Sequence, residues 1–198
     1  MPATLQKLNN EIAGLVKKVA RSLAVVRDGK QGGAAGIIWH SDGLIVTNAH
    51  IISRERAKVM LADGRTFDAE LVARDVDKDL AALSIDADGL AALPLGDSES
   101  LMPGQFVIAM GHPRGINNVA TAGIVMGEGA RHLKVSNAQS LLAVNLSLRP
   151  GNSGGPLVDT EGRLVGINTI MTGPDTGLAI PVDTAKAFLR GNTGSPVS

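Results

Sequence analysis

Three separated segments of the chain carry residue types that could act together as a nucleophile, a base and an acid. Ser153 lies in the glycine-flanked segment 149–157 (RPGNSGGPL), His50 follows one apolar run, and Asp79 begins another. A serine hydroxyl is a weak nucleophile that needs a general base. Histidine titrates near neutrality, and a carboxylate can orient it and stabilise its protonated form. The residue types therefore predict acyl transfer through His50, Asp79 and Ser153.

The glycines around Ser153 permit backbone conformations that other residues rarely adopt. They let the amides of Gly151 and Ser153 point into one small space, where an oxyanion would form after attack on a carbonyl. We expect backbone groups of Gly151, Asn152 and Ser153 to form this oxyanion hole. The pattern Gly-x-Ser-x-Gly also fits the nucleophile elbow of an α/β-hydrolase, but that fold alternates strands with helices and orders its triad Ser, Asp, His.

The order and spacing of further motifs resemble the HtrA/DegP group of chymotrypsin-fold serine proteases. The resemblance extends over about residues 15–189. Its motifs are SDG at 41–43, TNAH at 47–50, DKDLA at 77–81, PLGDS at 94–98, GHP at 111–113, GIV at 123–125, PGNSGGPL at 150–157, VGIN at 165–168 and AIP at 179–181.

This resemblance implies an all-β fold of two antiparallel β-barrel lobes, with the site in the cleft between them. It implies an ATP-independent serine endopeptidase in which His50 is the general base, Asp79 orients it and Ser153 is the nucleophile, with no cofactor. Asp75, Asp77 and Asp86 compete with Asp79 on charge alone, but only Asp79 directly precedes the Leu-Ala-x-Leu run of the family. We interpret the other histidines, His40, His112 and His132, as structural.

The same resemblance implies which residues contact a substrate. Ser147 stands six residues before the nucleophile, where trypsin-like enzymes keep an acid, so a Lys or Arg side chain finds no carboxylate there. We expect cleavage after small or medium apolar residues. The strand at 169–171 would pair with the substrate backbone. The expected substrate-binding residues are Ser147, Leu148, Thr169, Ile170, Met171 and Leu178.

One segment departs from the pattern of the family. Residues 143–149 replace an acidic, alanine-rich run that usually precedes the Pro-Gly-Asn-Ser block. Arg149 within this segment either reaches acidic groups of a substrate or faces water.

Composition excludes several other kinds of function. The chain has 198 residues, no net formal charge, no cysteine, no tyrosine, one tryptophan and three phenylalanines. Balanced charge and few aromatics argue against nucleic-acid binding, and the absence of cysteine excludes disulfides and thiolate metal sites. The four histidines lie far apart, so we expect no metal.

The sequence also bears on localisation. No stretch approaches the ~20 apolar residues of a membrane span. The N-terminus has no signal peptide, which predicts a cytoplasmic protein as the sequence is written, or a periplasmic or other extracytoplasmic one if a targeting segment was removed.

Short apolar runs separated by turn residues predict many strands, as in a barrel or sandwich. The expected strands are 34–39, 44–47, 57–61, 66–74, 80–85, 105–110, 119–126, 141–146, 163–170 and 177–180. Residues 93–104, rich in Pro, Gly and Ser, predict a linker between two lobes. The domain prediction is a helical segment at 1–23, a first barrel lobe at 24–96, a second at 97–190 that ends in a short helix at 183–189, and a tail at 191–198, with no PDZ domain.

Residues 4–23 show apolar residues at steps of three and four, which predicts an N-terminal helix with Thr4 as its N-cap. Its apolar stripe either packs on the body of the protein or makes an oligomer contact. Two other functions stay open beside the endopeptidase: a latent peptide-binding or scaffold module on a protease fold, and an esterase that uses the same site.

Overall fold

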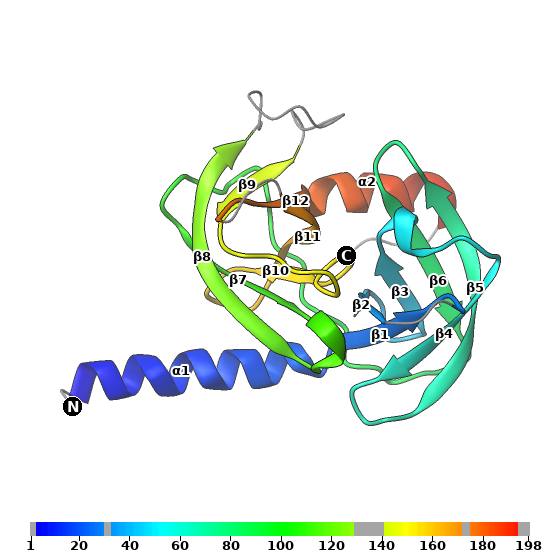
Figure 1. Cartoon of the computed structure of the whole chain (residues 1–198), viewed down its shortest axis with the longest axis horizontal. Helices are drawn as coiled ribbons and strands as arrows, with labels where there is room; N and C mark the ends of the chain where they lie inside the picture. Colours follow the sequence, from blue (N-terminus) through cyan, green and yellow to red (C-terminus); the bar gives the residue numbers. More distant parts are fainter. Residues whose placement is uncertain (1–2, 30–32, 129–140, 172–174, 194–198) are drawn as a thin grey trace.

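Two closed antiparallel barrels make up most of the molecule, as the computed structural model in Figure 1 shows. The structure describes residues 3–29, 33–128, 141–171 and 175–193. The first barrel closes in the order β1-β2-β3-β6-β5-β4 and the second in the order β10-β11-β12-β9-β8-β7. The predicted fold class, all-β with two barrel lobes and a helix near each end, is confirmed.

The strands of the first barrel are β1 (Leu23–Arg27), β2 (Ala34–Ile38), β3 (Leu44–Thr47), β4 (Arg56–Leu61), β5 (Thr66–Asp75) and β6 (Leu80–Ile85). Those of the second are β7 (Phe106–Gly111), β8 (Val119–Glu128), β9 (Leu142–Asn145), β10 (Pro156–Val158), β11 (Leu164–Met171) and β12 (Gly177–Pro181). The remaining elements are the helices α1 (Ala3–Ala20) and α2 (Val182–Thr193) and the 3₁₀ turns η1 (Ala49–Ile51) and η2 (Pro113–Gly115).

Every strand predicted from the sequence matches an observed strand, with ends that differ by at most two residues. The strands β1 and β10 were missed. The predicted N-terminal helix extends to residue 23 and so includes the first residue of β1. The strand β10 is only three residues long, begins with a proline and follows the glycine-rich turn. The backbone of β10 pairs with β7 and β11 because the barrel closes there, and no local sequence pattern predicts that pairing.

The helix α1 ends at Ala20, three residues earlier than predicted, and begins at Ala3 rather than after Thr4. A turn follows, in which the Ser22 amide donates to the Val19 carbonyl at 2.9 Å. Leu23 belongs to β1, where it faces Ile37 of β2 and is fully buried. Pairing with β2 and β4 therefore overrides the helical pattern at this position.

The apolar stripe of α1 divides into two halves. Leu15, Val16 and Val19 pack against the core between the barrels. Leu5 and Leu8 are each 52% exposed, and the N-terminal half of the helix projects away from the barrels (Figure 1). Oligomerisation through this helix stays a prediction.

Three clusters of apolar side chains form the interior. One fills each barrel, and a third lies between the barrels and under α2, where Phe188 and Leu189 are buried. α2 contacts β5 and β6 of the first barrel and β11 and β12 of the second. The two barrels are thus held face to face, which fixes the cleft between them.

None of the helices in the described residues is long and apolar enough to cross a membrane. In the same residues, no three His, Cys, Asp or Glu side chains are grouped so that they could hold a metal ion.

Candidate active site

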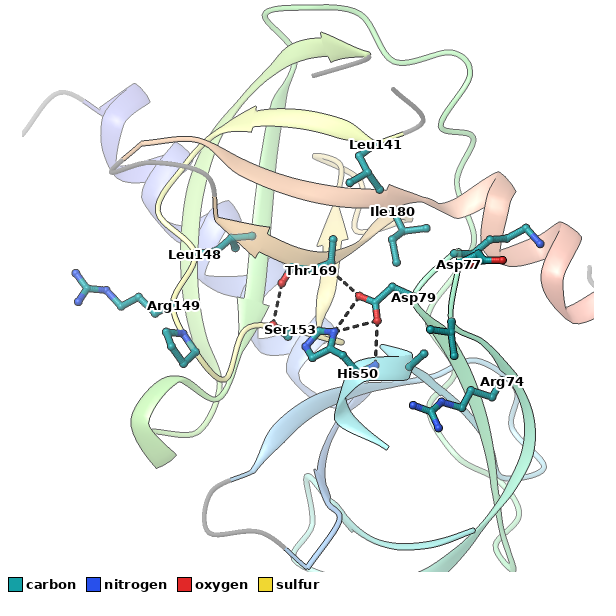
Figure 2. Close-up of a pocket in the computed structure, with 14 residues that line it drawn as sticks. His50, Arg74, Asp77, Asp79, Leu141, Leu148, Arg149, Ser153, Thr169 and Ile180 are labelled. Carbon is teal, nitrogen blue, oxygen red and sulfur yellow. Dashed lines mark hydrogen bonds and ion pairs between the residues drawn. The ribbon is translucent and has the colours of Figure 1, made fainter. Parts of the chain in front are cut away.

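His50, Asp79 and Ser153 line one cleft of about 770 Å³, although they are far apart in the sequence. His50 lies on η1, directly after β3, and Asp79 lies in the turn between β5 and β6. Ser153 lies in the turn that leads into β10. The first barrel therefore supplies the histidine and the aspartate, and the second supplies the serine (Figure 2).

The side chain of His50 is held by Asp79. The ring atom Nδ1 lies 2.9 Å from both carboxylate oxygens of Asp79, and the backbone amide of His50 donates to Oδ1 at 3.0 Å. Asn48 donates from its Nδ2 to the Asp79 carbonyl at 3.1 Å, which holds the turn against η1. A carboxylate only accepts, so the neutral ring carries its proton on Nδ1 and leaves Nε2 as a proton acceptor.

Thr169 provides a further donor to the carboxylate. Its Oγ1 donates to Asp79 Oδ2 at 2.6 Å. Burial raises the pKa of Asp79, but the hydrogen bonds from His50 and Thr169 together outweigh it and hold the pKa below its usual value. Asp79 is therefore ionised at neutral pH.

The contact between Thr169 and Asp79 could not be read from the sequence, which placed Thr169 only among the substrate-binding residues. The two residues are separated by 90 positions and belong to different barrels. In the structure, the pairing of β11 with β12 shifts register between Asn168 and Ile170. Such irregularities re-aim single side chains beside functional sites, and Thr169 lies at this one.

The hydroxyl of Ser153 donates to the backbone carbonyl of Thr169 at 2.9 Å. Among the described residues, no hydrogen bond joins this hydroxyl to His50. Thr169 thus contacts the acid through its side chain and the serine through its backbone (Figure 2).

The backbone before Ser153 forms a tight turn. Pro150 and Gly151 are its central residues, Gly151 has a φ of 103°, and the Asn152 amide donates to the Arg149 carbonyl at 2.9 Å. These are the features of a type II turn, which favours Pro and then Gly at its centre. Of the three residues expected to form the oxyanion hole, Asn152 has its amide engaged in the turn. Within the described part of the chain, the amides of Gly151 and Ser153 donate no hydrogen bond.

Gly154 allows the two barrels to approach at the serine. A Cβ at this position would lie 2.1 Å from the carbonyl oxygen of Ala35 and 2.3 Å from Oγ1 of Thr47, both in the first barrel. The Ala35 amide in turn donates to the Ser153 carbonyl at 3.0 Å. The glycine therefore serves the contact that places Ser153 opposite His50.

The predicted substrate-binding residues are distributed unevenly. Leu148 and Thr169 line the cleft, whereas Leu178 is fully buried and is not among the described residues that line it. Ser147 is half-buried. The backbones of Ile170 and Met171 belong to β11, and their side chains lie outside what the structure describes.

Several cleft residues have no signal in the sequence that assigns them to it. The apolar ones are Leu141 and Ile180 of the second barrel and Val76 of the first, and the charged ones are Arg74 and Lys78. They meet only because the two barrels face each other. Arg149 and Asp77 line the cleft as well, and the Arg149 side chain is exposed.

The remaining acids and histidines have other partners or places. Lys78 donates to Asp75 at 2.6 Å. Asp42 lies 2.8 Å from the exposed His40. His112 is buried behind the turn at Gly151, and His132 lies outside the described residues.

Comparison with known proteins shows the family to which the chain belongs. The trypsin-like peptidase domain family matches residues 34–167. Protease Do-like 1, chloroplastic, of Arabidopsis thaliana is 41% identical over 173 residues, which cover 80% of the chain and 39% of that relative. Serine protease HTRA1 of Xenopus tropicalis is 37% identical over 195 residues, 91% of the chain and 42% of the relative.

A bacterial relative, the periplasmic serine endoprotease DegP of Salmonella typhimurium, is 38% identical over 161 residues, 78% of the chain and 34% of the relative. The chain thus spans less than half the length of these curated relatives. The two barrels, the family match and these relatives show that the chain belongs to the trypsin-like peptidase family, with HtrA and DegP serine proteases as its relatives.

Proposed function

We propose that the protein is a serine endopeptidase that hydrolyses peptide bonds through an acyl-enzyme, with His50 as general base, Asp79 as its orienting acid and Ser153 as nucleophile. One observation carries this proposal. Asp79 holds Nδ1 of His50 at 2.9 Å in the same cleft as Ser153, and the neutral ring then has Nε2 available to accept the serine proton.

In this reaction His50 Nε2 takes the proton of Ser153 while Oγ forms a bond to the substrate carbonyl carbon. The electron pair of the carbonyl moves to its oxygen, where the unengaged amides of Gly151 and Ser153 would stabilise the charge. The electron pair on the oxygen then re-forms the carbonyl as the bond from its carbon to the substrate nitrogen breaks, and the protonated ring gives its proton to the leaving amine. His50 Nε2 then takes a proton from a water molecule as the water oxygen attacks the acyl-enzyme. It gives that proton to Ser153 Oγ when the bond from Oγ to the acyl carbon breaks, which restores Ser153.

The serine must first leave the Thr169 carbonyl, to which it donates at 2.9 Å. A substrate strand that pairs with β11 would offer its own backbone amide to that carbonyl. This exchange would free the Ser153 hydroxyl to turn toward His50. Substrate binding and activation of the nucleophile would therefore be coupled at Thr169.

We extend the proposal to substrates: polypeptides cut after small or medium apolar residues. Leu148 contributes an apolar wall, and Ser147 offers no carboxylate for a basic side chain. A peptide library cleaved mainly after Arg or Lys would contradict this preference.

The central test is Ser153→Ala, because it removes the nucleophile and leaves the fold intact. Peptide turnover should fall by about 10⁶-fold, as in triads whose serine is removed. Labelling of the wild-type protein by a fluorophosphonate should appear at Ser153 in peptide mass spectra. Undiminished hydrolysis by the purified variant would refute the mechanism.

A latent peptide-binding module is the second candidate, and the bond from Ser153 to Thr169 favours it, since the serine is not joined to His50. The two candidates differ in one measurement. A module would bind peptides without reacting with the fluorophosphonate, whereas an endopeptidase would do both.

A further inference from the structure

We propose that His112 is a positioning residue that holds the turn Arg149–Asn152 in the orientation which oxyanion stabilisation needs; the inference rests on the proposed peptidase function. His112 does not line the cleft among the described residues and so is assigned no contact with substrate. It acts through the backbone that supports the turn.

The segment Gly111–Pro113 lies directly against this turn. The His112 amide donates to the Gly151 carbonyl at 2.9 Å. A Cβ at Gly111 would lie 2.7 Å from Cα of Asn152, and a Cβ at Gly151 would lie 2.5 Å from the His112 carbonyl oxygen. The two backbones are therefore in contact, and any displacement of residues 111–113 moves the peptide group between Gly151 and Asn152.

The ring of His112 closes the loop that carries this segment. Its Nδ1 accepts a hydrogen bond from the Asn118 amide at 3.3 Å, while the residue is only 4% exposed. Between these two residues lies η2, in which Arg114 has a φ of 55°, and Asn118 itself has a φ of 58°. This left-handed conformation is unfavourable for Arg114 and much less so for Asn118, so the loop needs contacts that compensate for it at Arg114. The buried ring is such a contact.

The protonation state of the His112 ring decides whether its Nδ1 can accept this hydrogen bond. A ring whose Nδ1 accepts carries its proton on Nε2, and this Nε2 is buried without a hydrogen-bond partner within the described residues. Burial lowers the pKa of His112 below its ordinary value. The neutral ring is therefore favoured, and only this form accepts from Asn118.

The contacts form one continuous path. The Asn118 amide fixes the ring, the ring fixes the loop, and the His112 amide fixes the Gly151 carbonyl. The Asn152 amide, bonded to Arg149, fixes the other end of the same peptide group. The direction of the Gly151 and Ser153 amides, which the proposed reaction uses, depends on that peptide group.

The test compares His112→Leu, which keeps an apolar filling but removes the acceptor, with His112→Asn, whose Oδ1 can still accept. The matched control is His40→Leu, at an exposed histidine away from the cleft. For His112→Leu we expect kcat for a peptide to fall at least tenfold with KM within twofold. Affinity for a peptide aldehyde, which forms an oxyanion on Ser153, should fall by a similar factor, and affinity for the product peptide should not change. His112→Asn should recover part of both losses, and His40→Leu should match the wild type.

Hydrogen–deuterium exchange of residues 147–157 gives a readout that does not need turnover. We expect faster exchange there in His112→Leu than in His40→Leu. Unchanged exchange and an unchanged kcat in the folded variant would overturn the positioning role, as would an equal loss of product-peptide affinity. If His112→Leu does not fold, His112→Asn and His112→Gln decide by the same measurements. A wild-type protein that fails to react with a fluorophosphonate would instead refute the peptidase function, and exchange would still decide the role of His112.

Discussion

Thr169 contacts both Asp79 and Ser153, and these two bonds have different consequences. The bond from its hydroxyl to Asp79 favours the ionised carboxylate that orients His50. The bond from Ser153 to its carbonyl holds the serine away from the ring. In the proposed peptidase, Thr169 would thus both support the acid and restrain the nucleophile until a substrate strand competes for its carbonyl.

Replacement of the Thr169 hydroxyl tests the first of these bonds. Thr169→Val keeps the shape but removes the donor, and hydrogen bonds to charged groups contribute roughly 1.5–3 kcal/mol. We expect kcat to fall by about 10- to 100-fold, while the pKa of Asp79 rises toward its ordinary value. Thr169→Ser retains the hydroxyl and serves as the control in the same kinetic assay. Equal activity of the two variants would contradict the assigned role.

In the proposed mechanism, the turn Arg149–Asn152 would decide whether the amides of Gly151 and Ser153 remain available for an oxyanion. Proline fixes its own φ near the value that the first central position of a type II turn requires, and Gly151 supplies the positive φ of the second. The turn is therefore largely formed before a substrate arrives.

Pro150→Ala should loosen this turn. Proline disfavours other backbone conformations by about 0.4–1 kcal/mol. If the folded protein without Pro150 populates other conformations of this turn to that degree, kcat should fall by about two- to fivefold. The chain offers a matched control in Pro103→Ala, because Pro103 and Gly104 form a similar turn in which the Gln105 amide donates to the Met102 carbonyl at 3.2 Å. That turn lies away from the cleft. The Pro103→Ala variant should therefore lose stability to a similar degree, while its kcat stays unchanged. Equal kcat values for both variants would show that Pro150 has no catalytic effect.

In the molecule as a whole, α2 joins the segment between the barrels to the second barrel. Asp183 accepts hydrogen bonds from the Ser98 amide at 2.7 Å and the Ser98 hydroxyl at 2.6 Å. Lys186 donates to Asp183 and to the Gly96 carbonyl, each at 2.7 Å. Burial raises the pKa of Asp183, but its bonds with Lys186 and Ser98 dominate and lower the pKa to about 2.

This lowered pKa predicts an acid-dependent loss of stability. The folded pKa lies below the unfolded value, so the contribution is complete above about pH 4 and disappears as the pH falls toward about 2. Its upper limit is roughly 2.5 kcal/mol, reduced by solvent screening because the side chain is 30% exposed.

Asp183→Asn should lower the free energy of unfolding at pH 7 and flatten its pH dependence between about pH 4 and 2. Asp86→Asn, at an exposed aspartate, is the control. Urea unfolding at several pH values measures both effects. If the free energy of unfolding has the same pH dependence in the wild type and in Asp183→Asn, the contacts of Asp183 with Ser98 and Lys186 do not have this role.

Local sequence patterns predicted most of the strands, the presence of a helix near each end and the residue types of the site. Alternation of apolar residues and turn-forming dipeptides are local signals, and they placed all strands but β1 and β10. The family resemblance carried by the motifs around His50, Asp79 and Ser153 predicted a shared site, and all three residues line one cleft.

The contacts between these residues depend on how the barrels close and pack. The bond from Thr169 to Asp79, the rotation of the Ser153 hydroxyl toward Thr169, and the support of Gly151 by His112 join segments that lie in different parts of the chain. Each of these contacts depends on the closure of a barrel or on the contact between the two barrels. A local sequence pattern predicts neither. The sequence therefore fixes which groups are present, whereas packing decides which atoms of those groups face each other.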